Sequence, residues 1–271
     1  IADGLHSTPF DADASEAATK GSAVHSLLLD GQEMFDEKYA TGGPINPKTG
    51  THYGRDTKKF QEWMKEQGGK SFLTEKEMKS VMQMVDSIKR DDFAMSVITM
   101  YGTERELTLL WSEDIEGVEV LCKARLDWWG PGIGIVDVKS TCDVDKKGFE
   151  KSVGNRGWYV QSWWYPRGAV MTGLTEHLPE YAWIVLENQP PHKLACYKPD
   201  DPASSDEETP NALGWMQATG RAAAYRGLKN YALHQSGSAD YVQTTKFIEI
   251  DTPSWVWESE ADLAEAGKVL K

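Results

Sequence analysis

The spacing of hydrophobic and polar positions changes several times along the chain, and each change predicts a different element. Apolar residues recur at helical spacing over 16–30 and around 60–66. The segment 74–91 has the strongest helical pattern, because Thr74 and Glu77 have the spacing of a capping box and an apolar stripe follows them. We expect this stripe to consist of Met78, Val81, Met82, Val85 and Ile88.

From about residue 105 the apolar residues alternate with polar ones, which is typical of strands. Three such runs with short connections, RELTLLW, VEVLCKARLDWW and GIGIVDVKS, predict an antiparallel meander. Two further strands are predicted at YAWIVLE and KLACYK, with one largely buried helix before them at 149–172 and a last helix at 213–234. This order predicts an α/β fold with a central mixed sheet flanked by helices.

Length and composition are those of a globular protein. The 271 residues, 40% of them hydrophobic, predict a single domain over 1–271. We expect a mobile acidic loop at 200–212, because that segment is highly charged and poor in apolar residues, and a C-terminal helix and tail at 213–271. No apolar run approaches the roughly 20 residues that a membrane helix needs, so no membrane partner is expected.

The cysteine content and the charge narrow the function classes. Cys122, Cys142 and Cys196 form neither a disulfide framework nor a CxxC zinc motif, so we expect reduced thiols in an intracellular protein. The net charge of −13 argues against a nonspecific coat on nucleic acid, although an enzyme could still gather basic residues along one channel. Candidates for such a channel are Arg55, Lys58, Lys59, Lys146, Lys147, Lys151, Arg156 and Arg167.

The run IVDVKS places two charged residues in an apolar strand. Asp137 and Lys139 are two positions apart and project from the same face of a strand. Asp127 ends the preceding strand, and the turn WWGPGIG can return the chain so that Asp127 lies beside Asp137. Paired carboxylates suit a hard cation such as Mg²⁺, and a nearby lysine can orient a water or stabilise a phosphate. An ordinary salt bridge at a strand end would use the same residues.

Two polar patterns lie on predicted helices. GSAVH has the form GxxxH and contains His25, and QSWWY has the form QxxxY and places Gln161 and Tyr165 on one helical face. Taken singly, His25 fits a satisfied core or surface histidine, and Gln161 with Tyr165 fits a simple hydrogen-bonding face.

In this order the motifs GxxxH, D, DxK and QxxxY resemble the PD-(D/E)xK nuclease superfamily, in its RecB-like exonuclease branch. GSAVHSLLLDG, the segment from GRDTKKF to KSVMQMV, CKARLDWW, IVDVKST and YVQSWWY are similar to the RecE-type exodeoxyribonuclease VIII nucleases of phages. The resemblance covers roughly 20–190, which would be the motif core, and it implies the PD-(D/E)xK nuclease fold.

The resemblance also implies a metal centre. By position, Asp127 and Asp137 would bind the catalytic metal, with the carbonyl group of Val138 as a further ligand. Lys139 would position the attacking water, and His25 would lie beside the metals and bind one.

The remaining roles and the cofactor follow from the same resemblance. Gln161 and Tyr165 would hold the substrate strand or its phosphate, and Glu106 on the strand before Asp127 could be an extra acidic ligand. The expected cofactor is Mg²⁺, with Mn²⁺ as an alternative. No iron–sulfur cluster is expected, because three cysteines fall short of the four that related iron–sulfur nucleases carry.

The function implied is that of a metal-dependent hydrolase, a 5′-to-3′ exonuclease that digests linear double-stranded DNA from its ends. It would leave 3′ single strands for a single-strand annealing protein in phage-type DNA recombination, act as a ring-shaped homotetramer, and work in the cytoplasm of the bacterial host cell. The motifs are shared with structure-specific and restriction-like endonucleases, which stay an alternative. A DNA-binding module without catalytic activity is the second alternative.

Overall fold

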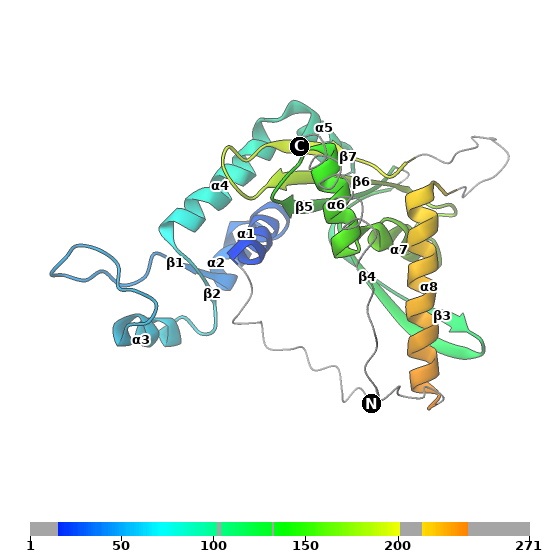
Figure 1. The fold of residues 1–271 in the computed structure, drawn as a ribbon, viewed down its shortest axis with the longest axis horizontal. Helices are drawn as coiled ribbons and strands as arrows, with labels where there is room; N and C mark the ends of the chain where they lie inside the picture. Colours follow the sequence, from blue (N-terminus) through cyan, green and yellow to red (C-terminus); the bar gives the residue numbers. More distant parts are fainter. Residues whose placement is uncertain (1–15, 102–103, 132, 201–212, 238–271) are drawn as a thin grey trace, which may run out of the picture. The chain divides into compact units, whose positions relative to one another are not determined.

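The computed structural model describes residues 16–101, 104–131, 133–200 and 213–237 (Figure 1). Its centre is a five-stranded sheet in the order β3-β4-β5-β6-β7. The strands are β3 (Glu104–Ile115), β4 (Val118–Gly130), β5 (Gly134–Thr141), β6 (Glu180–Glu187) and β7 (Leu194–Tyr197). The β5–β6 pair is parallel and the other pairs are antiparallel, which confirms the predicted mixed sheet and the meander of its first three strands.

The helices occur in groups between these strands. Before the sheet come α1 (Glu16–His25), the π-helical turn η1 (Ser26–Asp30), α2 (Gln32–Lys38), α3 (Lys58–Glu66), α4 (Glu75–Arg90) and α5 (Asp92–Tyr101). After β5 come α6 (Lys146–Arg156) and α7 (Trp158–Met171), and α8 (Trp215–Gln235) follows β7. The short strands β1 (Tyr39–Thr41) and β2 (Ser71–Leu73) form a separate parallel pair that the sequence pattern does not predict.

Two hydrophobic cores cover the two faces of the sheet. One core packs α1, α4 and α5 against residues such as Val136 and Val138 of β5. The other packs α6, α7 and α8 against the opposite face, which includes Ile135. Because side chains alternate along a strand, Asp137 and Lys139 lie on the same face as Ile135, toward α6 and α7. The sheet thus directs the two charged residues toward the helices that follow β5.

Three helix predictions need correction. In α4 the capping box of Thr74 and Glu77 is present, but Met82 is exposed and Met84 is buried in its place. The single helix predicted at 149–172 is two helices, because Gly157 adopts a left-handed φ of 68° and ends α6. Helix α5 was not predicted, since its sequence DFAMSVITMY has no polar face and several β-branched residues.

Some predictions fall outside or at the edge of the described residues. Of the acidic loop at 200–212 only Asp200 is described, and its carboxylate accepts hydrogen bonds from the first two backbone N–H groups of α8. The chain separates into a unit that ends at Ala232 and a second unit, 233–271, of which only 233–237 is described. The site below lies in the first unit, and a single domain over 1–271 stays a prediction.

The helices and the cysteines can be compared with the sequence predictions one by one. Within the described ranges, none of the helices is both long and apolar enough to cross a membrane. Cys122 is buried, Cys196 is half-buried and Cys142 is exposed, and each is a free thiol.

Candidate active site

Asp127 and Asp137 face each other where two strands separate. The ladder between β4 and β5 ends at the pair Trp128 and Val136, so the next opposite positions are Asp127 and Asp137. Beyond that pair, the carboxylate of Asp127 accepts a hydrogen bond from the backbone N–H of Val138 at 2.8 Å. The side chain thus replaces a missing strand partner and holds the two carboxylates at the same level of the sheet, as the WWGPGIG turn predicts.

Glu106 adds a third carboxylate beside those of Asp127 and Asp137, and the three form a carboxylate row across the sheet. Its neighbours on both sides in β3 pair with β4, which leaves Glu106 opposite Asp127 and outside the regular ladder. Its φ of 52° lies in the left-handed region that glutamate rarely adopts, and such strain is common at functional sites. Its carboxylate forms an ion pair with Arg125 of β4. Three neighbouring strands therefore each contribute one carboxylate.

His25 reaches this row from the end of α1, and the glycine of the GxxxH motif brings the helix close. A Cβ atom on Gly21 would lie 2.7 Å from Oγ of Ser140, so glycine lets α1 approach β5 this closely without displacing the Ser140 hydroxyl group. One turn later, Nε2 of His25 donates to the carbonyl of Val138 at 2.7 Å. This bond places the ring proton on Nε2, which leaves Nδ1, 3.6 Å from Oδ2 of Asp127, able to bind a cation.

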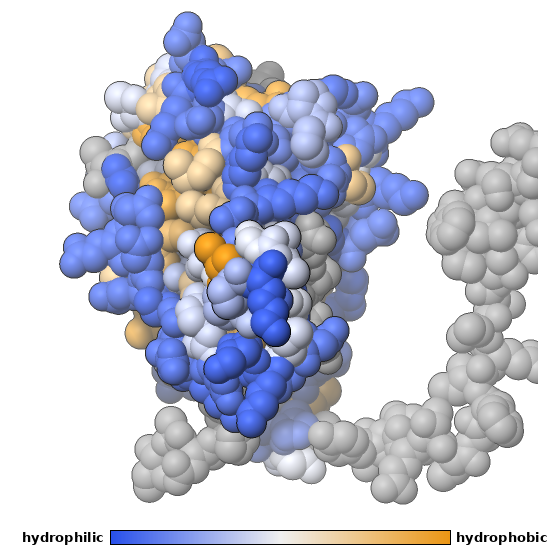
Figure 2. Space-filling view, turned by 90° about the vertical axis from the view of Figure 1, so that its left-hand side faces the viewer, coloured by the Kyte–Doolittle hydropathy of each residue, from blue (hydrophilic) through white to orange (hydrophobic). Residues whose placement is uncertain are grey.

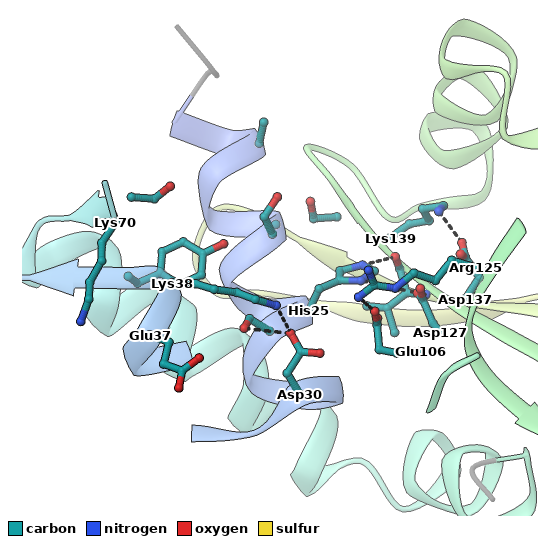
Figure 3. Close-up of a pocket in the computed structure, with 18 of the residues that line it drawn as sticks. His25, Asp30, Glu37, Lys38, Lys70, Glu106, Arg125, Asp127, Asp137 and Lys139 are labelled. Atoms are coloured by element: carbon teal, nitrogen blue, oxygen red, sulfur yellow. Dashed lines mark hydrogen bonds and ion pairs between the residues drawn. The ribbon is translucent and has the colours of Figure 1, made fainter. Parts of the chain in front are cut away.

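The resulting cluster has the composition of a divalent-cation site. His25, Glu106 and Asp127 each offer a ligand atom, and these atoms lie within 4.8 Å of one another (Figure 3). Asp137 and the carbonyl of Val138 adjoin them. A set rich in carboxylate oxygen fits a hard cation such as Mg²⁺, so the residues present fit the expected cofactor. When bound, such a cation supplies Lewis acidity toward a water and a phosphate.

Lys139 lies beside this row as its spacing predicts. Its Nζ is 2.5 Å from Oδ2 of Asp137. Asp137 itself is only 1% exposed. The same ammonium group is 5.5 Å from the centre of the Trp158 ring. The lysine is thus held between a buried carboxylate and an aromatic ring, next to the cluster of carboxylates.

Crowding of negative charge raises pKa values in the cluster. Burial, followed by the charge of Asp137, raises the pKa of Asp127 to about 6, although His25 and Lys139 oppose the shift. Burial and the charges of Asp137 and Asp127 also raise the pKa of Tyr165 above its ordinary value. A bound cation would relieve this crowding, and Tyr165 stays a hydroxyl donor at neutral pH.

Gln161 and Tyr165 share one face of α7, but only one of them reaches the cavity. Tyr165 is among the residues that line it, whereas Gln161 is not among the described lining residues. Nε2 of Gln161 donates to the Tyr165 hydroxyl oxygen at 3.1 Å. Gln161 therefore contacts the site through Tyr165, and a direct contact of Gln161 with substrate stays a prediction.

The cluster occupies one side of a cavity of about 800 Å³. Its other side, which the sequence does not predict, comes from η1, α2, β1 and the turn before β2 and includes Asp30, Glu37, Lys38 and Lys70 (Figure 3). The parallel β1–β2 pairing, for which the sequence gives no signal, places Lys70 beside Lys38 at the start of the two strands, and Lys38 in turn pairs with Asp30. The cavity thus extends well past the carboxylates and can hold more than a single phosphate group.

Most of the basic residues proposed for a DNA channel have acidic partners. Arg167 forms two hydrogen bonds with the buried carboxylate of Glu113, at 2.9 and 3.0 Å, which assigns it to the packing of α7 on β3. Arg55 pairs with Glu77. Seen from the side that carries α3, the surface is largely hydrophilic, with apolar residues in small groups (Figure 2). Among the eight candidates, Arg156 lines the described cavity.

Fold and site together indicate the PD-(D/E)xK nuclease superfamily, since Asp127, Asp137 and Lys139 lie together on the adjacent strands β4 and β5 of a mixed sheet. The chain belongs to the family described as "PDDEXK-like domain of unknown function (DUF3799)", whose model matches residues 6–199. None of the curated proteins matches the sequence significantly.

Two solved structures are similar to this chain. The crystal structure of a "Putative exonuclease" from Eubacterium rectale has a TM-score of 0.53 and 14% identity, over 89% of this chain and 78% of that one. The structure of SSO0001 has a TM-score of 0.27 and 14% identity, over 57% of this chain and 69% of that one, which is too low to indicate a shared fold. The first similarity confirms the predicted fold, and the closer kinship to RecE-type nucleases stays a prediction.

Mg²⁺ is expected to stabilise the fold more at pH 8 than at pH 5. Because the folded pKa of Asp127 is raised from 3.8 to about 6, the metal-free fold holds a proton between these values that the unfolded chain releases. This group's contribution to metal-free stability therefore falls as the pH rises through that window. Mg²⁺ needs the ionised carboxylate, so its effect grows over the same window. At about 100 times the Kd it stabilises by roughly 2.7 kcal/mol, or about 5–10 °C in Tm.

Thermal melts with and without Mg²⁺ at the two pH values measure this difference. Asp127→Asn should lose most of the Mg²⁺ effect, whereas Asp86→Asn, at a half-exposed position on α4, should keep it. Equal Mg²⁺ effects in the wild type and Asp127→Asn would remove Asp127 from the metal centre.

Proposed function

We propose that this protein is a metal-dependent nuclease that hydrolyses the phosphodiester bonds of DNA. The observation that carries the proposal is the row of Glu106, Asp127 and Asp137 on three adjacent strands, with Nζ of Lys139 2.5 Å from Asp137. Membership of the PDDEXK-like family and the fold shared with the E. rectale protein support it.

In this proposal each side chain has a defined task. Asp127, Glu106 and the Nδ1 atom of His25, whose ligand atoms lie close together, would hold the divalent cation. Asp137 and the carbonyl group of Val138, which line the same cavity, would complete the ligand set. The ammonium group of Lys139 orients the attacking water and opposes charge that develops on the phosphate. The hydroxyl group of Tyr165, whose raised pKa keeps it protonated, donates a hydrogen bond to a phosphate oxygen.

The substrate and polarity form the finer part of the proposal. The enzyme digests linear double-stranded DNA in the 5′-to-3′ direction and leaves 3′ single strands for an annealing protein, as a ring-shaped homotetramer in the cytoplasm of a bacterial host cell. The resemblance of the motifs to RecE-type nucleases supports this part. The E. rectale protein that shares the fold is itself described as a "Putative exonuclease", which agrees with this part of the proposal.

End-labelled DNA tests both levels of the proposal. Purified protein is incubated with linear duplexes labelled at the 5′ or the 3′ end and with a covalently closed plasmid, in Mg²⁺, in Mn²⁺ or in EDTA. We expect early release of the 5′ label as nucleotides, late loss of the 3′ label, an intact plasmid and no reaction in EDTA.

Each contrary result selects one of the other assignments. Nicking or linearisation of the closed plasmid would identify an endonuclease of the same superfamily. Early release of the 3′ label would reverse the polarity. Binding of DNA without cleavage in either metal would leave a DNA-binding module and refute the nuclease proposal.

A further inference from the structure

We propose that Arg156, held against the indole ring of Trp158, binds a backbone phosphate of the DNA strand next to the phosphate that is cleaved. The proposal rests on the nuclease function above and extends it to a residue outside the metal-binding and water-orienting groups.

The two side chains are brought together by the break between two helices. Arg156 is the last residue of α6 and Trp158 the first of α7, with Gly157 in the left-handed region between them. Both side chains line the cavity. The guanidinium carbon of Arg156 lies 5.2 Å from the centre of the Trp158 ring, a distance at which a cation is attracted to an aromatic face. The ring therefore holds the guanidinium group at the wall of the cavity.

The same ring connects Arg156 to the reacting groups. Nζ of Lys139 lies 5.5 Å from the centre of the Trp158 ring and 2.5 Å from Oδ2 of Asp137. Arg156 is thus separated from the carboxylate row by Trp158 and Lys139. A strand whose cleaved phosphate lies at Lys139 can place its next phosphate at Arg156.

Arg156 also differs in charge pairing from the other cations of the cavity. Three of them form ion pairs and the fourth donates to a backbone carbonyl group: Lys38 with Asp30, Arg125 with Glu106, Lys139 with Asp137, and Lys70 with the carbonyl of Asp36. Within the described part of the chain, Arg156 has no carboxylate at ion-pair distance, and its side chain is exposed. An exposed guanidinium without a carboxylate partner is suited to bidentate hydrogen bonds with a phosphate.

A structural role is the competing explanation. An arginine in the last turn of α6 interacts favourably with the negative end of the helix, and its stem can shield Trp158. That role predicts a loss of stability on replacement and no change in the salt dependence of DNA binding. A phosphate contact predicts the reverse, because each such contact releases counterions from the DNA.

DNA affinity measured over a series of KCl concentrations separates the two roles. Fluorescence anisotropy follows a labelled duplex with a single-stranded overhang, with Ca²⁺ in place of Mg²⁺ as the hard cation. Arg156→Ala should weaken binding about tenfold at low salt and make the slope of log K against log salt shallower by about 0.7 to 0.9. Arg156→Lys should keep the slope, because it keeps the positive charge.

Arg90→Ala is the matched control, because it removes the same charge from an exposed position on α4. Steady-state cleavage in Mg²⁺ adds a second readout, in which Arg156→Ala raises KM more than it lowers kcat. Equal affinities and equal slopes for Arg156→Ala and Arg90→Ala would overturn this inference while cleavage by the wild type keeps the nuclease function. A drop in Tm with an unchanged slope would assign Arg156 to the structural role.

Failure of the nuclease function gives a different result. Suppose that the wild type cleaves no DNA, but Arg156→Ala still makes the slope of log K against log salt shallower. The phosphate contact of Arg156 is then supported and the nuclease function is refuted. If the wild type neither cleaves nor binds DNA, both proposals fall.

Discussion

Replacing Asp137 by asparagine, or Lys139 by alanine, should lower the rate of DNA cleavage by about 10³-fold or more without unfolding the protein. The asparagine side chain keeps the size of the aspartate but loses the charge that holds a cation, and loss of Lys139 removes the group that orients the water. Asp137 is buried beside Asp127. Removing the charge of Asp137 relieves its repulsion with Asp127 but leaves the ammonium group of Lys139 without its carboxylate partner, so the two effects on the stability of the metal-free fold oppose each other.

Cleavage rates and melting temperatures on the same preparations test this expectation. Lys89→Ala, at an exposed position on α4, is the control for the lysine, and Asp86→Asn is the control for the aspartate. A well-folded Asp137→Asn protein with a near-normal rate would contradict the active-site assignment. A variant that loses stability in proportion to its rate would show only that the residue supports the fold.

The second large effect concerns stability. Arg167→Ala should destabilise the protein by about 3 kcal/mol, because it leaves the carboxylate of Glu113 buried without its cation. Both oxygens of that carboxylate accept hydrogen bonds from Arg167, and the Trp111 indole N–H also donates to it. The corresponding fall in Tm is about 6–12 °C.

A double variant separates the ion pair from simple loss of packing. Glu113→Leu combined with Arg167→Leu should recover part of the stability, because neither charge is then left alone. Urea unfolding of the two single variants, the double variant and Arg90→Ala measures the coupling. If Arg167→Ala keeps its stability and instead loses DNA affinity, Arg167 belongs to the DNA channel after all.

The sequence predicts the part of the fold that local patterns specify. The meander β3–β4–β5 and the facing of Asp127 with Asp137 follow from two-residue alternation and one glycine-rich turn. Local patterns do not specify the break at Gly157, because glycine also occurs within helices, as Gly154 and Gly168 do here. Helix α5 lacks the polar face by which surface helices are recognised.

The site was predictable only where a motif spans few residues. The place of Glu106 depends on a left-handed backbone conformation that nothing in its neighbours requires. The role of Arg167 depends on Glu113, 54 positions away in the sequence, and a pairing over that distance leaves no local pattern. The second side of the cavity depends likewise on the β1–β2 pairing, whose strands have three residues each.

The hydrogen bond from the Val138 backbone to Asp127 has a consequence for how this fold can evolve. The carboxylate both accepts a strand hydrogen bond and faces the cluster, so selection for folding and selection for catalysis act on one side chain. A descendant that abandons catalysis is released from the need for charge at this position but still needs an oxygen acceptor. Asparagine, which keeps that acceptor, is therefore the substitution expected in inactive homologues, whereas an apolar residue would also require β4 and β5 to pair differently.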